Sequence, residues 1–187
     1  LTVFTEAATG PYRFTPLLCA LAGAERVYAL ARDTRWGTAA GTVDAARAVA
    51  RDWGVQDRVI FLTEKCPDIL AEADILTNSG NVRPIDRWTV AALKPTCVVP
   101  LMWETWEHRP GELDLEACRE KGILVLGTDE EAIDFRWFTG MVLIRMLLDS
   151  GLEVHGNRLL VISSSPVCRA ICRALALNGA DFRWTSL

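Results

Sequence analysis

Residues 26–63 read RVYALARDTRWGTAAGTVDAARAVARDWGVQDRVIFLT, and this stretch decides the fold. It begins with a short apolar run at 26–30, continues through a polar loop into an amphipathic segment at 42–53, and ends with a second apolar run at 59–63. Runs that are apolar throughout, and not alternating, are typical of strands in a sheet covered on both faces. The stretch therefore predicts a strand, a helix and a second strand parallel to the first.

The same alternation extends over the rest of the chain. Further apolar runs predict strands at 2–5, 74–77, 97–101, 123–126, 159–163 and 181–184. Amphipathic segments predict helices at 12–21, 67–73, 87–93, 115–121, 133–150 and 166–178. The pattern predicts an α/β protein with a Rossmann-like, doubly wound, mostly parallel sheet, followed by the start of a second βαβ unit of the dinucleotide-binding type. We expect a domain at 1–132, a connecting helix at 133–151 and the partial second unit at 152–187.

Composition excludes several classes of protein. The chain has 187 residues, of which 50% are hydrophobic and 24% charged, as expected for a packed domain. The longest apolar segment, 138–148, is interrupted by Gly140 and Arg145, so we expect no membrane span. A net charge of −4 without a basic tail argues against nucleic-acid binding. The sequence begins without Met and inside an apolar segment, so we expect a fragment or a processed chain.

The six cysteines form no CxxC pair. Cys168 and Cys172 are one helical turn apart, but no His or carboxylate with ligand spacing accompanies them, so we predict no metal site. Most of the cysteines lie inside apolar stretches. We expect them to be reduced, buried thiols of a cytoplasmic protein.

Polar residues collect in the loops that follow the predicted strands, where open α/β sheets bind ligands. Arginines in such loops can hold a carboxylate or phosphate through paired hydrogen bonds, and we predict that Arg83 and Arg109, with Asn78, bind an anionic small molecule. These arginines are alternatively solvated or paired with nearby acids. His108 and Glu104 are the predicted proton-transfer groups, because an imidazole titrates near neutral pH. The alternative for His108 is an ordinary surface position.

The second half resembles the D-2-hydroxyacid dehydrogenases and S-adenosylhomocysteine hydrolase. LDLEAC at 113–118 and KGILV at 121–125 are similar to the passage that ends the dehydrogenase substrate domain. A long helix and then GNRLLVI at 156–162 are similar to the opening of their NAD-binding unit. The resemblance covers roughly residues 93–187. It implies NAD or NADP as cofactor, bound between the two parts of the chain.

This resemblance has a clear departure at its most specific motif. The glycine positions of G-x-G-x-x-G/A fall on Ser163, Ser165 and Cys168, and the acidic residue that holds the ribose would follow the last residue of the sequence. Serine is small and its hydroxyl can bind phosphate. We therefore predict that these three residues contact the cofactor.

Residues 1–80 resemble, more weakly, the S-adenosylmethionine-dependent methyltransferases. Gly10 lies where their glycine-rich first loop would be, and Asp33 lies two residues beyond the expected ribose-binding acid. The resemblance implies that Gly10 and Asp33 contact a cofactor, which in this alternative is S-adenosylmethionine.

Three functions remain open from the sequence. The first is an NAD(P)-binding oxidoreductase related to 2-hydroxyacid dehydrogenases, degenerate or a fragment. The second is a methyltransferase-like protein. The third is a non-catalytic Rossmann-like binding or assembly domain. Because one βαβ unit cannot cover both faces of its sheet, the rest of that sheet must come from missing chain, a partner or the first domain's own sheet, and we also expect a homo-oligomer.

Overall fold

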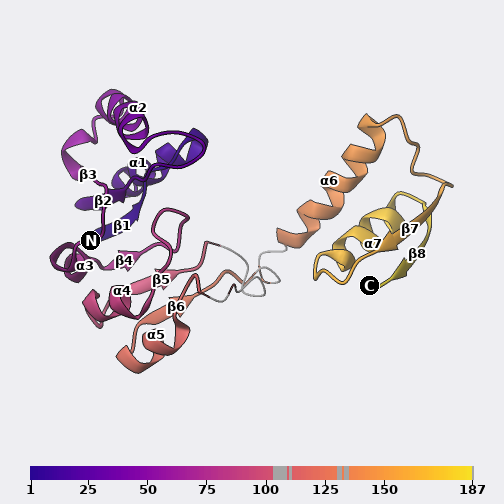
Figure 1. The fold of residues 1–187 in the computed structure, drawn as a ribbon. Coiled ribbons are helices and arrows are strands. Elements are labelled where there is room, and N and C mark those ends of the chain that lie inside the picture. Colours follow the sequence, from indigo (N-terminus) through magenta and orange to yellow (C-terminus); the bar gives the residue numbers. More distant parts are fainter. Residues whose placement is uncertain (103–108, 110, 130–131, 133–134, 187) are drawn as a thin grey trace. The chain divides into compact units, whose positions relative to one another are not determined.

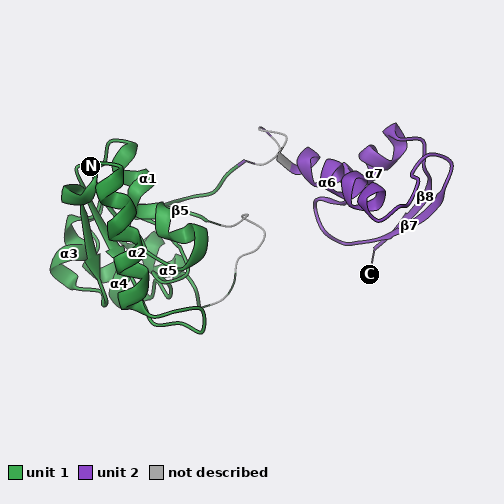
Figure 2. Cartoon of the chain, turned by 90° about the horizontal axis from the view of Figure 1, so that it is seen from above, with its two compact units in different colours: residues 1–128 green, residues 129–187 purple. Residues whose placement is uncertain are grey.

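The computed structural model describes residues 1–102, 109, 111–129, 132 and 135–186. The chain forms two compact units, Leu1–Thr128 and Asp129–Leu187, coloured separately in Figure 2. Each unit has its own sheet and its own apolar core. The two units are described separately below.

Unit 1 contains a six-stranded sheet in the order β3-β2-β1-β4-β5-β6, and every neighbouring pair is parallel (Figure 1). Its strands are β1 (Thr2–Glu6), β2 (Arg26–Leu30), β3 (Val59–Leu62), β4 (Ile75–Leu76), β5 (Val98–Pro100) and β6 (Leu124–Leu126). The helical segments are η1 (Gly10–Phe14), α1 (Thr15–Leu21), α2 (Ala39–Asp52), η2 (Gln56–Arg58), α3 (Pro67–Glu72), α4 (Arg87–Ala92) and α5 (Leu115–Lys121). This is the strand order of a doubly wound nucleotide-binding fold.

The sheet of unit 1 is covered on both faces, which is why its strands are apolar without alternation. On one face, Val3 and Val27 pack with Leu17 of α1 and Ala50 of α2. On the other, side chains of β1, β2, β4 and β5 pack with those of α3, α4 and α5: Phe4, Leu30, Leu70, Leu76, Val90, Val99 and Ala117. Two of these helices begin at an aspartate whose side chain accepts a backbone N–H, Asp86 for α4 and Asp114 for α5.

Unit 2 consists of α6 (Phe135–Asp149), β7 (Arg158–Ile162), α7 (Cys168–Leu177) and β8 (Asp181–Thr185). β7 and β8 are parallel, and α6 and α7 share a core with Leu159 and Val161. The two helices approach closely at Gly140, where an added Cβ would lie 2.5 Å from the carbonyl oxygen of Ala170. The opposite face of the sheet is exposed at Leu160 and Ile162.

The predicted fold class and all the predicted strands and helices are confirmed, with shifts at their ends. The predicted strand at 74–77 shortens to β4, although the backbone N–H groups of Asp74 and Thr77 still donate to the carbonyls of Thr2 and Phe4 in β1. The predicted helix at 12–21 divides into η1 and α1, which begin near Pro11 and Pro16 respectively. In the structure α6 packs on α7 within unit 2, and our boundaries at 132 and 151 stay predictions.

All six cysteines are free thiols, and burial raises the pKa of Cys97 and of Cys118 to about 11. No helix among the described residues is long and apolar enough to cross a membrane. Within the same residues, no group of three His, Cys, Asp or Glu side chains is arranged to hold a metal ion.

Candidate functional site

The strand order of unit 1 reverses between β1 and β4, and ligands of open α/β sheets bind at the carboxyl ends of the strands at such a point. A pocket of about 480 Å³ lies there, which we call the switch-point pocket. Its lining comes from the loops after β1, β2, β4 and β5: Glu6, Ala8, Thr9, Tyr12, Thr34, Trp36, Ser79, Gly80, Asn81, Arg83 and Met102. Four separate segments of the chain therefore converge on one concave surface.

Glu6 is the buried acid of this pocket, with only 6% of its surface exposed. Its Oε2 accepts the backbone N–H of Asn81 at 2.8 Å. Burial raises the pKa of the Glu6 carboxyl, while the Asn81 N–H and the charge of Arg83 act in the opposite direction. Burial is the largest of these effects, so the pocket contains a carboxyl group that gains from a hydrogen-bond donor.

A buried polar network holds the loops around Glu6. The hydroxyls of Thr5 and Thr77 are 2.8 Å apart, and those of Thr77 and Ser79 are 3.0 Å apart. The Asn81 side chain donates to the carbonyl oxygens of Ala7 at 2.9 Å and Leu30 at 3.4 Å. These bonds join the carboxyl ends of β1, β2 and β4, and so they fix the floor of the pocket before a ligand arrives.

The predicted anion-binding residues have different positions. Arg83 lines the pocket, but its guanidinium donates to the carbonyl of Asn78 and lies 3.0 Å from Oε2 of Glu112. Arg109 is largely exposed, 3.6 Å from the other oxygen of Glu112. Asn78 is fully buried; its Oδ1 accepts the N–H of Met102, whereas its Nδ2 has no hydrogen-bond partner among the described residues. Arg83 and Asn78 thus lie together, each with bonds to the protein already formed.

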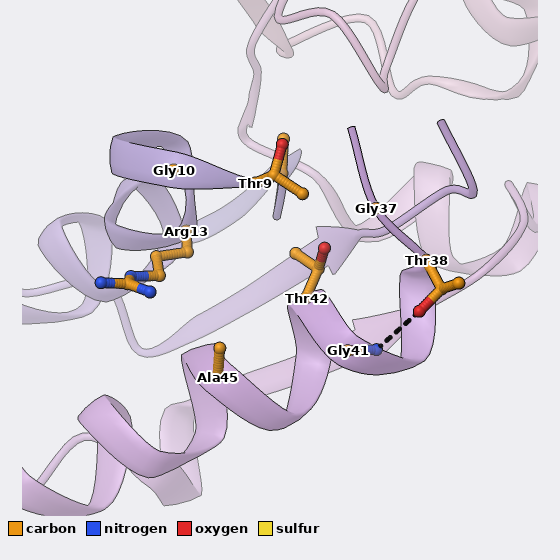
Figure 3. A pocket seen from close by; sticks show the side chains of 9 residues that line it. Thr9, Gly10, Arg13, Gly37, Thr38, Gly41, Thr42 and Ala45 are labelled. Atoms are coloured by element: carbon orange, nitrogen blue, oxygen red, sulfur yellow. Dashed lines mark hydrogen bonds between the residues drawn. The ribbon is translucent and has the colours of Figure 1, made fainter. Parts of the chain in front are cut away.

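A second hollow of about 310 Å³ adjoins the first and shares Ala8 and Thr9 with it (Figure 3). Figure 3 shows Thr9 and Thr42 extending toward one another across it, beside the hydrogen bond from the Gly41 N–H to Thr38. Gly10 lines this hollow with a φ of 65°, a left-handed conformation that favours glycine.

Asp33, the second residue predicted to contact a cofactor, serves the protein itself. Its Oδ1 accepts the N–H of Ala39 at 2.7 Å, in the first turn of α2. Thr38 accepts from Gly41 in the same turn. At the N-terminus of α2, a carboxylate and a hydroxyl therefore already accept backbone N–H groups, so fewer of these groups remain to bind a phosphate.

Lys65, in the loop after β3, is a half-buried base on the same edge of the sheet. Its Nζ donates to the carbonyl of Pro84 and, at 3.1 Å, to the hydroxyl of Thr89. Burial lowers the pKa of Lys65 to about 8, against the opposing effect of Asp86. The amine holds the loop after β3 to the loop after β4.

In unit 2, the predicted cofactor residues follow β7. The Ser163 hydroxyl accepts the N–H of Ser165 at 3.1 Å, and the Ser165 hydroxyl accepts the N–H of Val167 at 3.4 Å. Both serines are half-buried. Cys168 is buried, and its sulfur faces that of Cys172 at 3.9 Å, so it packs within the unit beside the turn.

His108 and Glu104, the predicted proton-transfer residues, lie outside the described residues. Sequence reasoning did not select Glu6, Asn81 or Lys65 as site residues. Glu6 had a usable signal, since it is the first acid after an apolar run that predicts a strand. Asn81 lies in the polar loop after the predicted strand at 74–77, but its role, like that of Lys65, depends on loops far away in the sequence.

No family model matches the chain, and no curated protein matches it. Among solved structures, it is similar to the A chain of dipicolinate synthase from Bacillus subtilis, with a TM-score of 0.56 and 11% identity over 100% of this chain and 60% of that one. The D-lactate dehydrogenase of Escherichia coli has a TM-score of 0.46 and 14% identity, covering 99% and 60%. At this identity the first of these likenesses establishes the fold. The comparisons give no support to the resemblance to methyltransferases or to S-adenosylhomocysteine hydrolase.

Proposed function

We propose that this chain is part of an NAD(P)-dependent oxidoreductase related to the 2-hydroxyacid dehydrogenases. It spans about 60% of the length of the dipicolinate synthase chain with which it shares its fold. In this proposal unit 2 holds the nicotinamide nucleotide and the switch-point pocket of unit 1 holds the substrate. The observation that carries the proposal is the β7–turn–α7–β8 unit, a parallel βαβ unit with two serines at the first two glycine positions of the dinucleotide motif.

The serine turn fits a diphosphate in a particular way. The N–H groups of Ser165 and Val167 are already bonded to serine hydroxyls. A hydroxyl that accepts an N–H keeps its own proton, so Ser163 and Ser165 would each donate an O–H to a phosphate oxygen. When bound, the nicotinamide group supplies hydride transfer. The roles that we assign to the chain are to bind, to orient the substrate and to move a proton, the last through His108 or Glu104.

The proposal is tested by thermal unfolding with NAD(H), NADP(H), S-adenosylmethionine and S-adenosylhomocysteine. A ligand present at about 100 times its dissociation constant should add about 2.7 kcal/mol of stability. We expect a nicotinamide nucleotide to raise the melting temperature, and Ser165→Trp to abolish the rise. Ser150→Trp, at an exposed position in the same unit, is the matched control and should retain it. Stabilisation by the S-adenosyl compounds alone would contradict the proposal.

A second candidate is a non-catalytic binding or assembly domain. The observation in its favour is that the serine turn already satisfies its own N–H groups, while Leu160 and Ile162 expose an apolar sheet face. This candidate predicts self-association without nucleotide affinity. Sedimentation of the chain and of Leu160→Lys distinguishes it, because only self-association through this face would be lost in the variant.

A further inference from the structure

We propose that the switch-point pocket selects an aromatic acid with a hydrogen-bond donor on carbon 2, either a hydroxyl or an ammonium group. Glu6 accepts from that donor, the carboxylate points to Arg83, and the ring lies against Trp36 and Tyr12. The inference rests on the proposed function, because it names the substrate class of the same pocket. It adds a specificity role for residues in unit 1 that no comparison assigns.

The donor end of the ligand is set by Glu6. Its Oε2 already bonds the Asn81 N–H, and the residue lines the pocket while only 6% of its surface is exposed. A buried carboxylate is costly unless it is hydrogen-bonded, so a ligand O–H or N–H at this position stabilises the complex more than it would in water. A ligand without a donor displaces water from the Glu6 carboxylate and gives it no hydrogen bond in return, so such a ligand binds more weakly.

The acid end is set by Arg83, whose charge acts on Glu6 across the same pocket. Arg83 is also paired with Glu112 at 3.0 Å, so the positive charge is held in place and partly balanced. A donor at Glu6 and a carboxylate at Arg83 match the two opposite charges of the pocket. A simple anion offers nothing to Glu6, and a simple cation offers nothing to Arg83.

The aromatic ring of the proposed ligand contacts apolar side chains at the rim of the pocket. Trp36 is 72% exposed, and Tyr12 and Met102 are also largely exposed, although all three line the pocket. Large exposed aromatic side chains around a concave site are typical of ligand contacts.

Trp36 is also held in place. It lies at the tip of a tight turn closed by paired hydrogen bonds between Thr34 and Gly37. Its N–H is bonded to the Thr34 hydroxyl, and the Arg35 guanidinium lies 4.5 Å from the centre of its ring. The backbone of Trp36 and one contact to its ring are therefore fixed by its own turn.

The test is a calorimetric or NMR titration of the full chain, without nucleotide, with four related probes. 3-Phenyllactate carries the ring, the donor and the carboxylate; 3-phenylpropionate lacks the donor, lactate lacks the ring, and 2-phenylethylamine lacks the carboxylate. We expect 3-phenyllactate or phenylalanine to bind about tenfold more tightly than 3-phenylpropionate, the factor expected for one hydrogen bond to a charged group. Lactate and 2-phenylethylamine should each be weaker by a similar factor.

Two variants assign the contacts to residues. Glu6→Gln should remove most of the preference for 3-phenyllactate over 3-phenylpropionate, whereas Glu64→Gln, an exposed acid outside the pocket, should not. Trp36→Ala should remove the preference for 3-phenyllactate over lactate, whereas Trp88→Ala, an exposed tryptophan on α4, should not. Because Trp36 is exposed, its variant should fold even if the variant of the buried Glu6 is destabilised.

Equal affinity for 3-phenyllactate and 3-phenylpropionate would overturn the inference, and so would equal effects of the Trp36 and Trp88 variants. Both measurements are made without nucleotide. Failure here together with nicotinamide nucleotide binding would sink the inference and leave the proposed function standing. Probe binding in the expected order, without any nucleotide affinity, would support the substrate class and contradict the proposed function.

Discussion

The two strand–turn–helix sites of this chain differ in how their polar groups are held. At the end of β1, Glu6 is buried and is fixed by a loop 75 residues away through the Asn81 N–H. At the end of β7, Ser163 and Ser165 are half-buried, and their hydroxyls accept N–H groups within their own turn. The backbone of Ser163 also bonds Thr185 and the Trp184 side chain of β8. The polar side chains of the first site are held by bonds between loops far apart in the sequence, and the serine hydroxyls of the second by bonds within one turn. In our proposal, this difference suits unit 1 to select the substrate and unit 2 to hold the nucleotide.

The largest expected difference between the units is in the stability lost when a helical glycine is replaced by alanine. In α6, a Cβ at Gly140 would meet the backbone of Ala170 at 2.5 Å, so Gly140→Ala should destabilise unit 2 by about 1–3 kcal/mol through overpacking. In α2, a Cβ at Gly41 would meet only the Thr38 hydroxyl, at 3.2 Å. Gly41→Ala gains the same helix propensity and should be far milder. Urea unfolding of both variants checks this, and equal losses of stability would contradict the close α6–α7 packing.

The two sites should also differ in how much stability is lost when a polar side chain is removed from each. Asn81→Ala should cost about 1–3 kcal/mol, because it leaves the buried carbonyls of Ala7 and Leu30 with fewer donors. Ser165→Ala removes one longer bond from a half-exposed turn and should cost less than about 1 kcal/mol. Thermal unfolding of the two variants is the measurement. A Ser165 variant as destabilised as the Asn81 variant would show that the turn is not merely local.

Much of this fold follows from local sequence, because strands and helices here are set by apolar runs, prolines and caps. The continuous run RVYAL at 26–30 predicts its strand, and the amphipathic segment at 115–121 predicts its helix, which Asp114 caps in the structure. The site depends on more distant relations. The Glu6 carboxylate, for example, bonds the N–H of Asn81, which is 75 residues away. Asp33 is predicted to contact a cofactor, and in the structure its Oδ1 accepts the N–H of Ala39 at the start of α2. A polar loop before a helix has two uses, capping and ligand binding, that a single sequence does not separate.

Lys65 predicts a pH dependence that belongs to unit 1. Its folded pKa of about 8 lies below the ordinary value of 10.5, so the unfolded chain binds more protons between these two values. The free energy of unfolding should therefore rise as pH increases from about 8 to 10.5, by about 1–2 kcal/mol after allowance for solvent screening. Denaturant unfolding across this range measures the rise, and Lys65→Met should flatten it. A fall in stability over this range that Lys65→Met removes would contradict the burial of the amine.

Glu6 predicts that the free energy of unfolding falls with rising pH, an effect smaller than that of Lys65 and opposite in sign. Burial raises its pKa above 4.5, so the folded chain holds the proton more tightly than the unfolded chain. Its contribution to stability is complete below pH 4.5 and is lost as the pH rises through the folded pKa. At neutral pH, Glu6→Gln should consequently raise the melting temperature slightly, because it removes a buried charge and keeps an acceptor for the Asn81 N–H. A lowered melting temperature would mean that the pairing with Arg83 outweighs the cost of burial.

The most direct test of nicotinamide binding at the serine turn is amide hydrogen exchange with and without saturating NADH, followed by mass spectrometry of peptides that cover both sites. We expect slower exchange at 163–172, in the turn after β7 and the first half of α7, with little change at 6–12 and 79–83. Protection confined to 6–12 and 79–83 would place the nucleotide in the switch-point pocket and contradict the assignment of cofactor and substrate to separate units. Unchanged exchange at both places would contradict nucleotide binding itself.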